Sequence, residues 1–152
     1  MNEAYEGAIR LLMRREHGAH ELALKLATKG HAKETIEAAL LLCQQRGWQS
    51  DARFAEQLCR LRVRQGYGPI RIQKELQALQ VARPLIDLAL QKEADHWISH
   101  ALLVWQKKIK TLGPLSYVAL QKQKQFLLYR GFTHETIETV VDSLPTEVDD
   151  SC

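Results

Sequence analysis

The sequence predicts an all-α protein built from three tandem three-helix repeats, with about nine helices in all. Apolar residues recur every three or four positions along most of the 152 residues, which is the spacing of amphipathic helices. Three segments of the chain also align with one another at a nearly constant period. No stretch alternates apolar and polar residues for long enough to predict a strand.

The internal alignment covers residues 21–40, 71–90 and 122–141, which match without a gap at offsets of 50 and 51. The shared apolar positions are Leu26, Leu76 and Leu127; Ile36, Ile86 and Ile137; and Leu40, Leu90 and Val141. Gly30 and Gly131 occupy one position with Gln80 between them. Each window is expected to form a helix, a turn of four or five residues and a second helix.

A further helix precedes each pair, over roughly residues 3–16, 51–65 and 94–111. The predicted repeats span residues 1–49, 50–92 and 93–144, and residues 145–152 form an acidic tail without an apolar pattern. One such repeat cannot bury its own apolar stripe, so we expect the repeats to stack into an elongated, curved array.

Local signals place the helix ends. Gly18, Gly30 and Gly47 each follow a helical pattern, which is the position of a C-terminal cap. Ser50 precedes a helical run and can cap its first turn. Proline is tolerated in the first turn of a helix, so the two prolines that open runs mark further helix starts, Pro69 and Pro84.

The composition excludes several classes of protein. Charged residues make up 26% of the chain and no apolar run is long enough to span a bilayer, so we expect no membrane association. The N-terminus lacks the pattern of a secretory signal. Three cysteines without CxxC spacing, Cys43, Cys59 and Cys152, predict free thiols in a reducing compartment, and hence the cytoplasm.

No catalytic constellation, cofactor motif or metal site is expected. The chain contains no phosphate-binding loop, no HExxH and no GxSxG. Gly66 and Gly68 form a GxG that precedes proline, which is typical of a turn. His96 and His100 lie one helical turn apart but lack a third ligand. Cys59 lies among arginines that could lower its thiol pKa, but it adjoins Leu58, so we expect it to be half-buried and not reactive.

Basic residues concentrate in two segments although the net charge is only +3. Residues 52–74 carry six basic residues against one acid, residues 96–134 carry six and no acid, and residues 135–152 carry six acids and no base. Such clusters neutralise phosphates or meet an acidic protein surface, although a solvated helix face has the same pattern. The candidate partner-binding residues are Arg53, Arg60, Arg64, Tyr67, Arg71, Lys74, Lys107, Lys108, Lys110, Lys122, Lys124 and Arg130.

Tyr67 is included because it lies in the glycine turn between Arg64 and Arg71, where it is the aromatic residue most open to a base or a partner pocket. A purely structural role for Tyr67 in the turn is equally consistent with the sequence. The other aromatic residues fall on apolar stripes or turns and are expected to be mostly core: Trp48, Phe54, Trp97, Trp105, Phe126 and Phe132.

Three segments resemble the bacterial RecX family: REHGAHEL (15–22), SDARFAEQLCRLRVRQGYGPIRIQKEL (50–76) and FLLYRGFTHETIETVV (126–141). The resemblance spans about residues 8–144, and its middle segment is the most specific. It implies tandem three-helix repeats and no enzymatic activity. It also implies binding to RecA and to the RecA filament on single-stranded DNA. The implied effect is inhibition of recombinase and co-protease activities, which modulates DNA repair and the SOS response.

The resemblance assigns roles only where motifs match. In the SDARFA segment these are Asp51, Arg53 and Phe54; around the turn, Arg60, Arg64, Gly66, Gly68 and Arg71; near the end, Arg130, Gly131 and Phe132. The two phenylalanines are expected to be structural, Asp51 to lie at a helix N-terminus and Gly131 to form a left-handed cap. The arginines are then the contact candidates.

Many family members are more basic than this chain, so the resemblance implies weak DNA binding at most, and it implies a monomer. An autonomous DNA-binding module that uses its basic helices on the phosphate backbone stays an alternative, and so does a passive helical scaffold for another protein.

Overall fold

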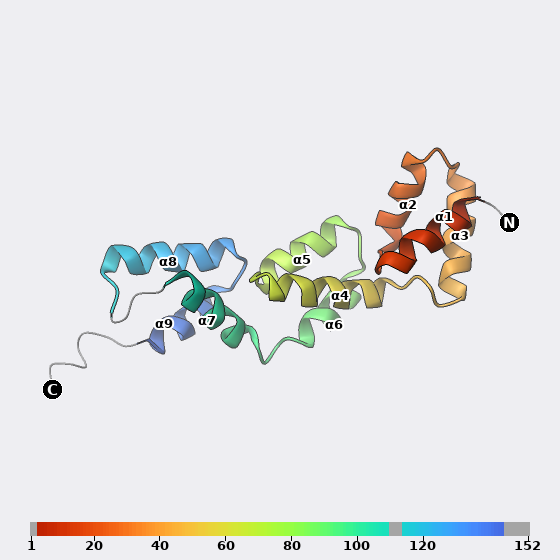
Figure 1. Cartoon of the computed structure of the whole chain (residues 1–152). Helices are drawn as coiled ribbons and strands as arrows, with labels where there is room; N and C mark the ends of the chain where they lie inside the picture. Colours follow the sequence, from red (N-terminus) through yellow and green to blue (C-terminus); the bar gives the residue numbers. More distant parts are fainter. Residues whose placement is uncertain (1–2, 110–113, 145–152) are drawn as a thin grey trace, which may run out of the picture. The chain divides into compact units, whose positions relative to one another are not determined.

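The protein is described by a computed structural model over residues 3–109 and 114–144 (Figure 1). Within these ranges it consists of nine α-helices and no strand, so the all-α prediction is confirmed. The helices are α1 (Glu3–Arg14), α2 (Ala19–Thr28), α3 (Lys33–Gln45), α4 (Asp51–Arg64), α5 (Pro69–Ala78), α6 (Arg83–Gln91), α7 (Trp97–Lys108), α8 (Tyr117–Tyr129) and α9 (His134–Asp142). The predicted acidic tail, residues 145–152, and Lys110 lie outside the described residues.

The chain divides into two compact units. The first unit joins Met1–Cys59 with Glu75–Ala89, and the second unit joins Arg60–Lys74 with Leu90–Cys152. Helices α4 and α5 each contribute residues to both units. The predicted repeat boundaries, after residues 49 and 92, stay a prediction.

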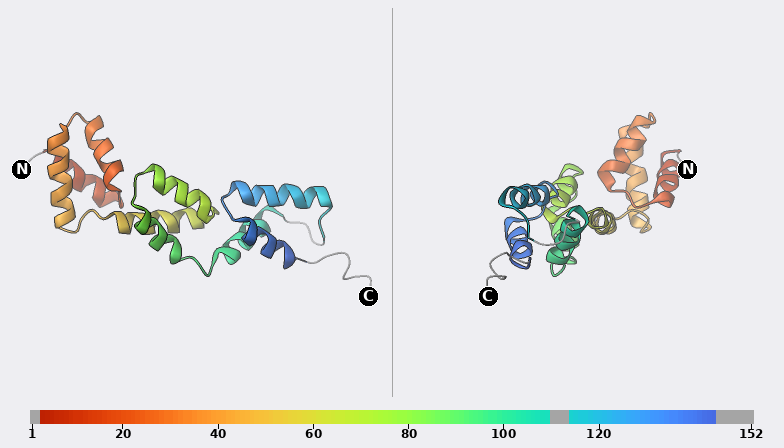
Figure 2. Two further views of the ribbon diagram at one scale, coloured as in Figure 1. Left: turned by 180° about the vertical axis from the view of Figure 1, so that it is seen from behind. Right: turned by 60° about the vertical axis from the view of Figure 1, so that its left-hand side comes forward.

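The first three helices bury their apolar stripes against one another, with α1 in contact with both α2 and α3 (Figure 2). Leu22, Leu26 and Cys43 are completely buried there. The full core of this group is Ala4, Tyr5, Ala8, Leu11, Leu22, Leu26, Ile36, Ala39 and Cys43. The predicted spacing of apolar residues therefore corresponds to real core positions.

The last three helices form a similar core in the second unit, with α7, α8 and α9 all in mutual contact (Figure 2). The core residues are Ala101, Trp105, Leu127, Phe132, Ile137 and Val140. Ser116 and Thr133 are the N-cap residues of α8 and α9, and the side chain of each accepts a hydrogen bond from a backbone N–H in the first turn.

The aligned position Gly30, Gln80 and Gly131 has the same unusual backbone in all three places. The φ angles are +95°, +60° and +98°, which is the left-handed region. In each case the next residue donates its backbone N–H to the carbonyl five positions earlier, which belongs to an aligned leucine. This is the Schellman arrangement that ends a helix. The internal alignment thus identified a repeated helix end, even where glutamine replaces glycine.

Gly18 is different, and its predicted role as a C-terminal cap is wrong. Its φ is −71° and it stands at the N-cap position of α2. A Cβ atom at Gly18 would lie 3.0 Å from the ring of Phe54, so glycine is needed there for space. Trp48 also departs from expectation, because it is 45% exposed and stacks on Tyr5, with a centroid distance of 6.0 Å.

Candidate partner-binding surface

The SDARFA segment is a structural clamp inside the first unit. Asp51 begins α4, and its Oδ1 accepts hydrogen bonds from the Ala19 backbone N–H at 2.8 Å and from Gln49 at 3.0 Å. It therefore caps the N-terminus of α2, whose own N-cap residue, Gly18, has no side chain to do so. Phe54 is 3% exposed. The structural roles expected for these two residues agree with this geometry.

Arg53 is engaged within the same clamp. Its Nε donates to Glu16 at 2.8 Å, and its guanidinium also donates to the carbonyl of Gly47 at 2.8 Å. Both partners lie in the first unit. The structure thus gives Arg53 a role within the first unit, where it joins the end of α1 to the start of α4.

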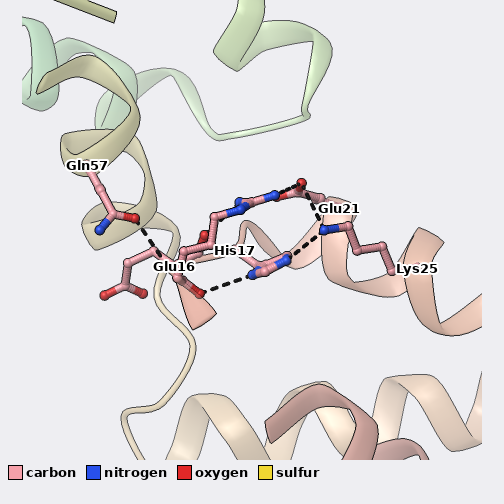
Figure 3. Close-up of polar contacts among 6 residues, drawn as sticks. Glu16, His17, Glu21, Lys25 and Gln57 are labelled. Atoms are coloured by element: carbon pink, nitrogen blue, oxygen red, sulfur yellow. Dashed lines mark hydrogen bonds and ion pairs between the residues drawn. The ribbon is translucent and has the colours of Figure 1, made fainter. Parts of the chain in front are cut away.

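A buried histidine completes the link between α1 and α2 (Figure 3). His17 is 1% exposed, with Nδ1 3.1 Å from the Arg15 carbonyl and Nε2 2.9 Å from Lys25 Nζ. A carbonyl only accepts and an ammonium only donates, so the contacts fit a neutral ring that carries its proton on Nδ1. Burial, together with Arg15 and Lys25, lowers the pKa of His17 and favours that neutral form.

In the second unit, the glycine turn before α5 docks on the RGF segment before α9. The Gly68 N–H donates to the Arg130 carbonyl at 2.7 Å, and the Ile70 N–H donates to the Gly131 carbonyl at 2.9 Å. A Cβ atom at Gly68 would lie 2.5 Å from that Gly131 oxygen. The two motifs are therefore joined backbone to backbone, which only glycine permits.

Tyr67 lies inside this joint. Its ring is half-buried, with the Arg71 guanidinium carbon 4.1 Å and the Arg130 guanidinium carbon 4.8 Å from the ring centroid. Arg130 also donates to the Gln65 carbonyl at 3.0 Å. These cation–π contacts and hydrogen bonds hold the turn in place, so Tyr67, Arg71 and Arg130 have structural partners within the second unit.

A groove of about 550 Å³ opens beside the joint, and all of its residues belong to the second unit. Four candidate residues contribute to it: Arg64 from the end of α4, Lys107 and Lys108 from the end of α7, and Arg130. The lining residues within 3–109 and 114–144 are Val63, Arg64, Gln65, Gly66, His100, Leu103, Val104, Lys107, Lys108, Phe126 and Arg130. The fold thus brings the two basic segments of the sequence together in one groove.

The cations of the groove differ in whether they contact other side chains of the protein. Arg64 and Lys107 are exposed, and neither forms an ion pair with a residue in 3–109 or 114–144. Lys108 lies 4.9 Å from the centroid of the Phe126 ring. Among the described residues, no acidic side chain lines the groove. A positive potential is therefore directed at whatever enters it.

The remaining candidates lie away from the groove lining. Lys124 pairs with Glu138 at 3.0 Å, which reduces its value as a contact. The others are exposed residues of the second unit: Arg60, Arg71, Lys74 and Lys122. As a whole the second unit has twelve basic and eight acidic residues, whereas the first has nine and ten. The basic character is thus a property of one unit.

The sequence analysis did not identify the apolar part of the groove. Val63, Val104 and Phe126 are half-buried, and Leu103 is 56% exposed. The spacing of apolar residues along α7 could have revealed it. Ala101 and Trp105 are buried, so Leu103, two residues from each, is on the opposite side of the helix, where an apolar residue is unusual.

Other chemistry is not supported by the described residues. Within 3–109 and 114–144 no group of three His, Cys, Asp or Glu side chains is placed to hold a metal ion. His100 instead contacts Glu93 at 2.7 Å. Cys43 and Cys59 are free thiols that are at most 1% exposed, and burial raises the pKa of Cys43. None of the described helices has the length and apolar character needed to cross a membrane.

Comparison with known proteins identifies the family. Residues 4–41, 50–90 and 98–141 match the family models for the first, second and third three-helix domains of RecX. The chain is 45% identical to the regulatory protein RecX of Legionella pneumophila (strain Corby) over 140 residues, which covers 92% of this chain and 93% of the relative. It is 39% identical to the regulatory protein RecX of Vibrio campbellii, covering 87% and 85%.

The fold agrees. The crystal structure of RecX from Lactobacillus salivarius superposes with a TM-score of 0.81 at 21% sequence identity, covering 93% of this chain and 94% of that one. These matches extend over all three helical triplets and nearly the whole length of the relatives. The chain therefore belongs to the RecX family of regulatory proteins.

Proposed function

We propose that this chain binds RecA and the RecA filament on single-stranded DNA, and that it inhibits recombinase and co-protease activity without being an enzyme. The partner follows from the family. The observation that supports a contact surface is the groove in which Arg64, Lys107 and Lys108 meet, with no acidic side chain among the described lining residues. We place the protein in the cytoplasm, where such a partner acts, and we propose that it acts as a monomer.

The physical basis is charge complementarity. A partner surface with carboxylates would be attracted to the second unit, which holds the excess of basic residues. Arg64 and Lys107 are the most informative residues, because they are exposed and form no ion pair with a described residue. Arg71 is a poorer choice for mutation, since its guanidinium stacks on Tyr67 and a change would disturb the docked turn.

The test is ATP hydrolysis by RecA on single-stranded DNA, with this chain added well below the RecA concentration. We expect inhibition by the native chain and at least about tenfold weaker inhibition by Arg64→Glu with Lys107→Glu. The matched control is Lys29→Glu with Lys33→Glu, which changes the net charge equally in the first unit, at two exposed positions: the C-cap of α2 and the first residue of α3. This control should inhibit like the native chain.

Two results would contradict the proposal. The native chain could leave RecA activity unchanged at every concentration, or both charge-reversed pairs could inhibit equally while keeping the native melting temperature. Tight binding to bare single-stranded DNA, with an affinity that falls steeply with salt, would instead support the alternative of an autonomous DNA-binding module.

A further inference from the structure

The groove of the second unit combines two chemistries. Its apolar lining is Val63, Leu103, Val104 and Phe126. Its cations are Arg64, Lys107, Lys108 and Arg130. The first three of these cations are exposed, whereas Val63, Val104 and Phe126 are half-buried. A ligand would thus meet aliphatic and aromatic surface at depth and positive charge nearer to solvent.

A nucleic acid fits this lining poorly. Single-stranded nucleic acids bind where bases can stack on open aromatic faces next to a positive track. The Phe126 ring has Lys108 Nζ at 4.9 Å and the Arg130 guanidinium carbon at 5.2 Å from its centroid. Tyr67, the neighbouring aromatic residue, is contacted by Arg71 and Arg130. A base would have to displace one of these cations, and the rest of the apolar lining is aliphatic.

An acidic peptide matches both chemistries. Its carboxylates can pair with the exposed cations, since the described residues of the groove include no competing acid. One large apolar side chain can enter the lining formed by Leu103 and Val104 and lose its contact with water. The volume of about 550 Å³ lies in the range of small-ligand pockets, so it admits a few side chains of a segment.

We propose that this groove binds an acidic peptide segment that carries one bulky apolar side chain. The inference rests on the proposed function only in that the regulated partner would present such a segment. It specifies the chemistry of the contact: charge brings the segment to the groove, and the apolar side chain fixes its register. Leu103 is the apolar residue whose role is specific, because it is 56% exposed and is not a residue of the α7–α9 core.

The experiment measures direct binding of a fluorescein-labelled peptide to the full-length chain by fluorescence anisotropy. The probe is a peptide of about twelve residues made of Asp, Glu and Gly with one central Leu. A second peptide has Ser in place of that Leu, and a third probe is a labelled oligo(dT) of similar length. We expect the Leu peptide to bind about tenfold more tightly than the Ser peptide, which corresponds to the burial of part of one Leu side chain.

Two variants assign the binding to the groove. Arg64→Glu with Lys107→Glu should weaken both peptides about tenfold or more. Leu103→Ser should remove most of the difference between the Leu and Ser peptides and leave the charge-driven part intact. Leu88→Ser, at a residue of α6 in the first unit that is 61% exposed, is the matched control and should change neither affinity.

Several outcomes would overturn the inference: no peptide binding, equal binding of the Leu and Ser peptides, or displacement of the Leu peptide by oligo(dT) at lower concentration than by unlabelled peptide. The result is separable from the proposed function. Inhibition of RecA without peptide binding would overturn the inference alone. Peptide binding with the expected variant pattern, but without inhibition of RecA, would support the inference and overturn the proposed function.

Discussion

Replacing Gly68 by alanine tests whether the docked glycine turn holds the second unit together. The new Cβ would lie 2.5 Å from the Gly131 carbonyl oxygen, 2.6 Å from its carbonyl carbon and 2.7 Å from the Phe132 nitrogen. All three are backbone atoms, which cannot swing aside as the end of a side chain can. Gly68 is not among the residues with positive φ, so the expected effect comes from space alone.

The magnitude follows from the cheaper of two responses. If the turn stays docked, overpacking costs about 1–3 kcal/mol. If the turn moves away, the hydrogen bonds from Gly68 and Ile70 to the RGF segment are lost, at about 0.5–1.5 kcal/mol each. The Arg71 and Arg130 contacts with Tyr67 would weaken as well. Both routes give a loss of about 2 kcal/mol in the free energy of unfolding.

The assay is urea unfolding followed by tryptophan fluorescence in a Trp48→Phe background. The remaining tryptophans, Trp97 and Trp105, both lie in α7 of the second unit and so report on that unit. A loss of about 2 kcal/mol should lower the urea midpoint by about 1 M. The control is Gly7→Ala in α1, where outside the backbone of its own helix the new Cβ meets only side-chain atoms, Leu26 Cδ2 at 3.3 Å and Arg10 Nη2 at 4.0 Å, and helix propensity improves.

Hydrogen exchange at the Ile70 amide gives a second measurement, because this N–H is protected by its bond to the Gly131 carbonyl. In the Gly68→Ala variant this amide should exchange faster, while amides inside α7 should change less. An unchanged urea midpoint together with unchanged protection of Ile70 would refute the docking argument. Since the turn also positions Arg64 and Gly66 in the groove, the variant should inhibit RecA more weakly if the proposed function holds.

Two further predictions concern the first unit. Gln80→Gly should stabilise the protein by about 0.5–1 kcal/mol in urea unfolding, because glutamine is held at φ +60° and glycine adopts that region without strain; a destabilised variant would contradict this. Burial lowers the pKa of His17, so as the pH falls the unfolded chain takes up a proton on this residue before the folded chain does. The free energy of unfolding should therefore begin to fall at the unfolded pKa of about 6.5 and continue to fall until the pH reaches the lower pKa of the folded chain. His17→Gln should flatten the dependence of the unfolding free energy on pH between about pH 7.5 and 5. Glu21, whose pKa is also lowered, loses its contribution only at lower pH. An equal pH dependence in both proteins would exclude His17 as its source.

Much of the fold was accessible from the sequence because its signals are local and repeated. Helix pairs were predicted from apolar spacing, and the alignment of Gly30 with Gln80 and Gly131 located a repeated left-handed helix end. Such features depend on the backbone preferences and apolar faces of neighbouring residues, which the chain itself displays. Gly18 was misread because a glycine after a helix has the same appearance whether it needs a positive φ or only space beside a distant ring.

The candidate site was only partly accessible for the same reason. The basic residues were visible as two segments, but their distribution along the chain does not reveal that Arg64 and Lys107 line one groove. Nor does it reveal that Arg53, Tyr67 and Arg130 have internal partners. Charge is a property of each residue, whereas availability for a contact depends on which neighbours the fold supplies.

By itself, the sequence determined the helical class, the threefold repetition and the positions of the basic segments, because each depends on local composition and spacing. Its motifs carried the resemblance to the family that the three family models confirm. Only the tertiary structure decided which of those charges share a surface. Gly68 and Gly131 lie more than sixty residues apart in the chain, and their close backbone contact sets the geometry in which the two basic segments meet. That contact depends on the packing of distant elements, which no periodicity within either segment encodes.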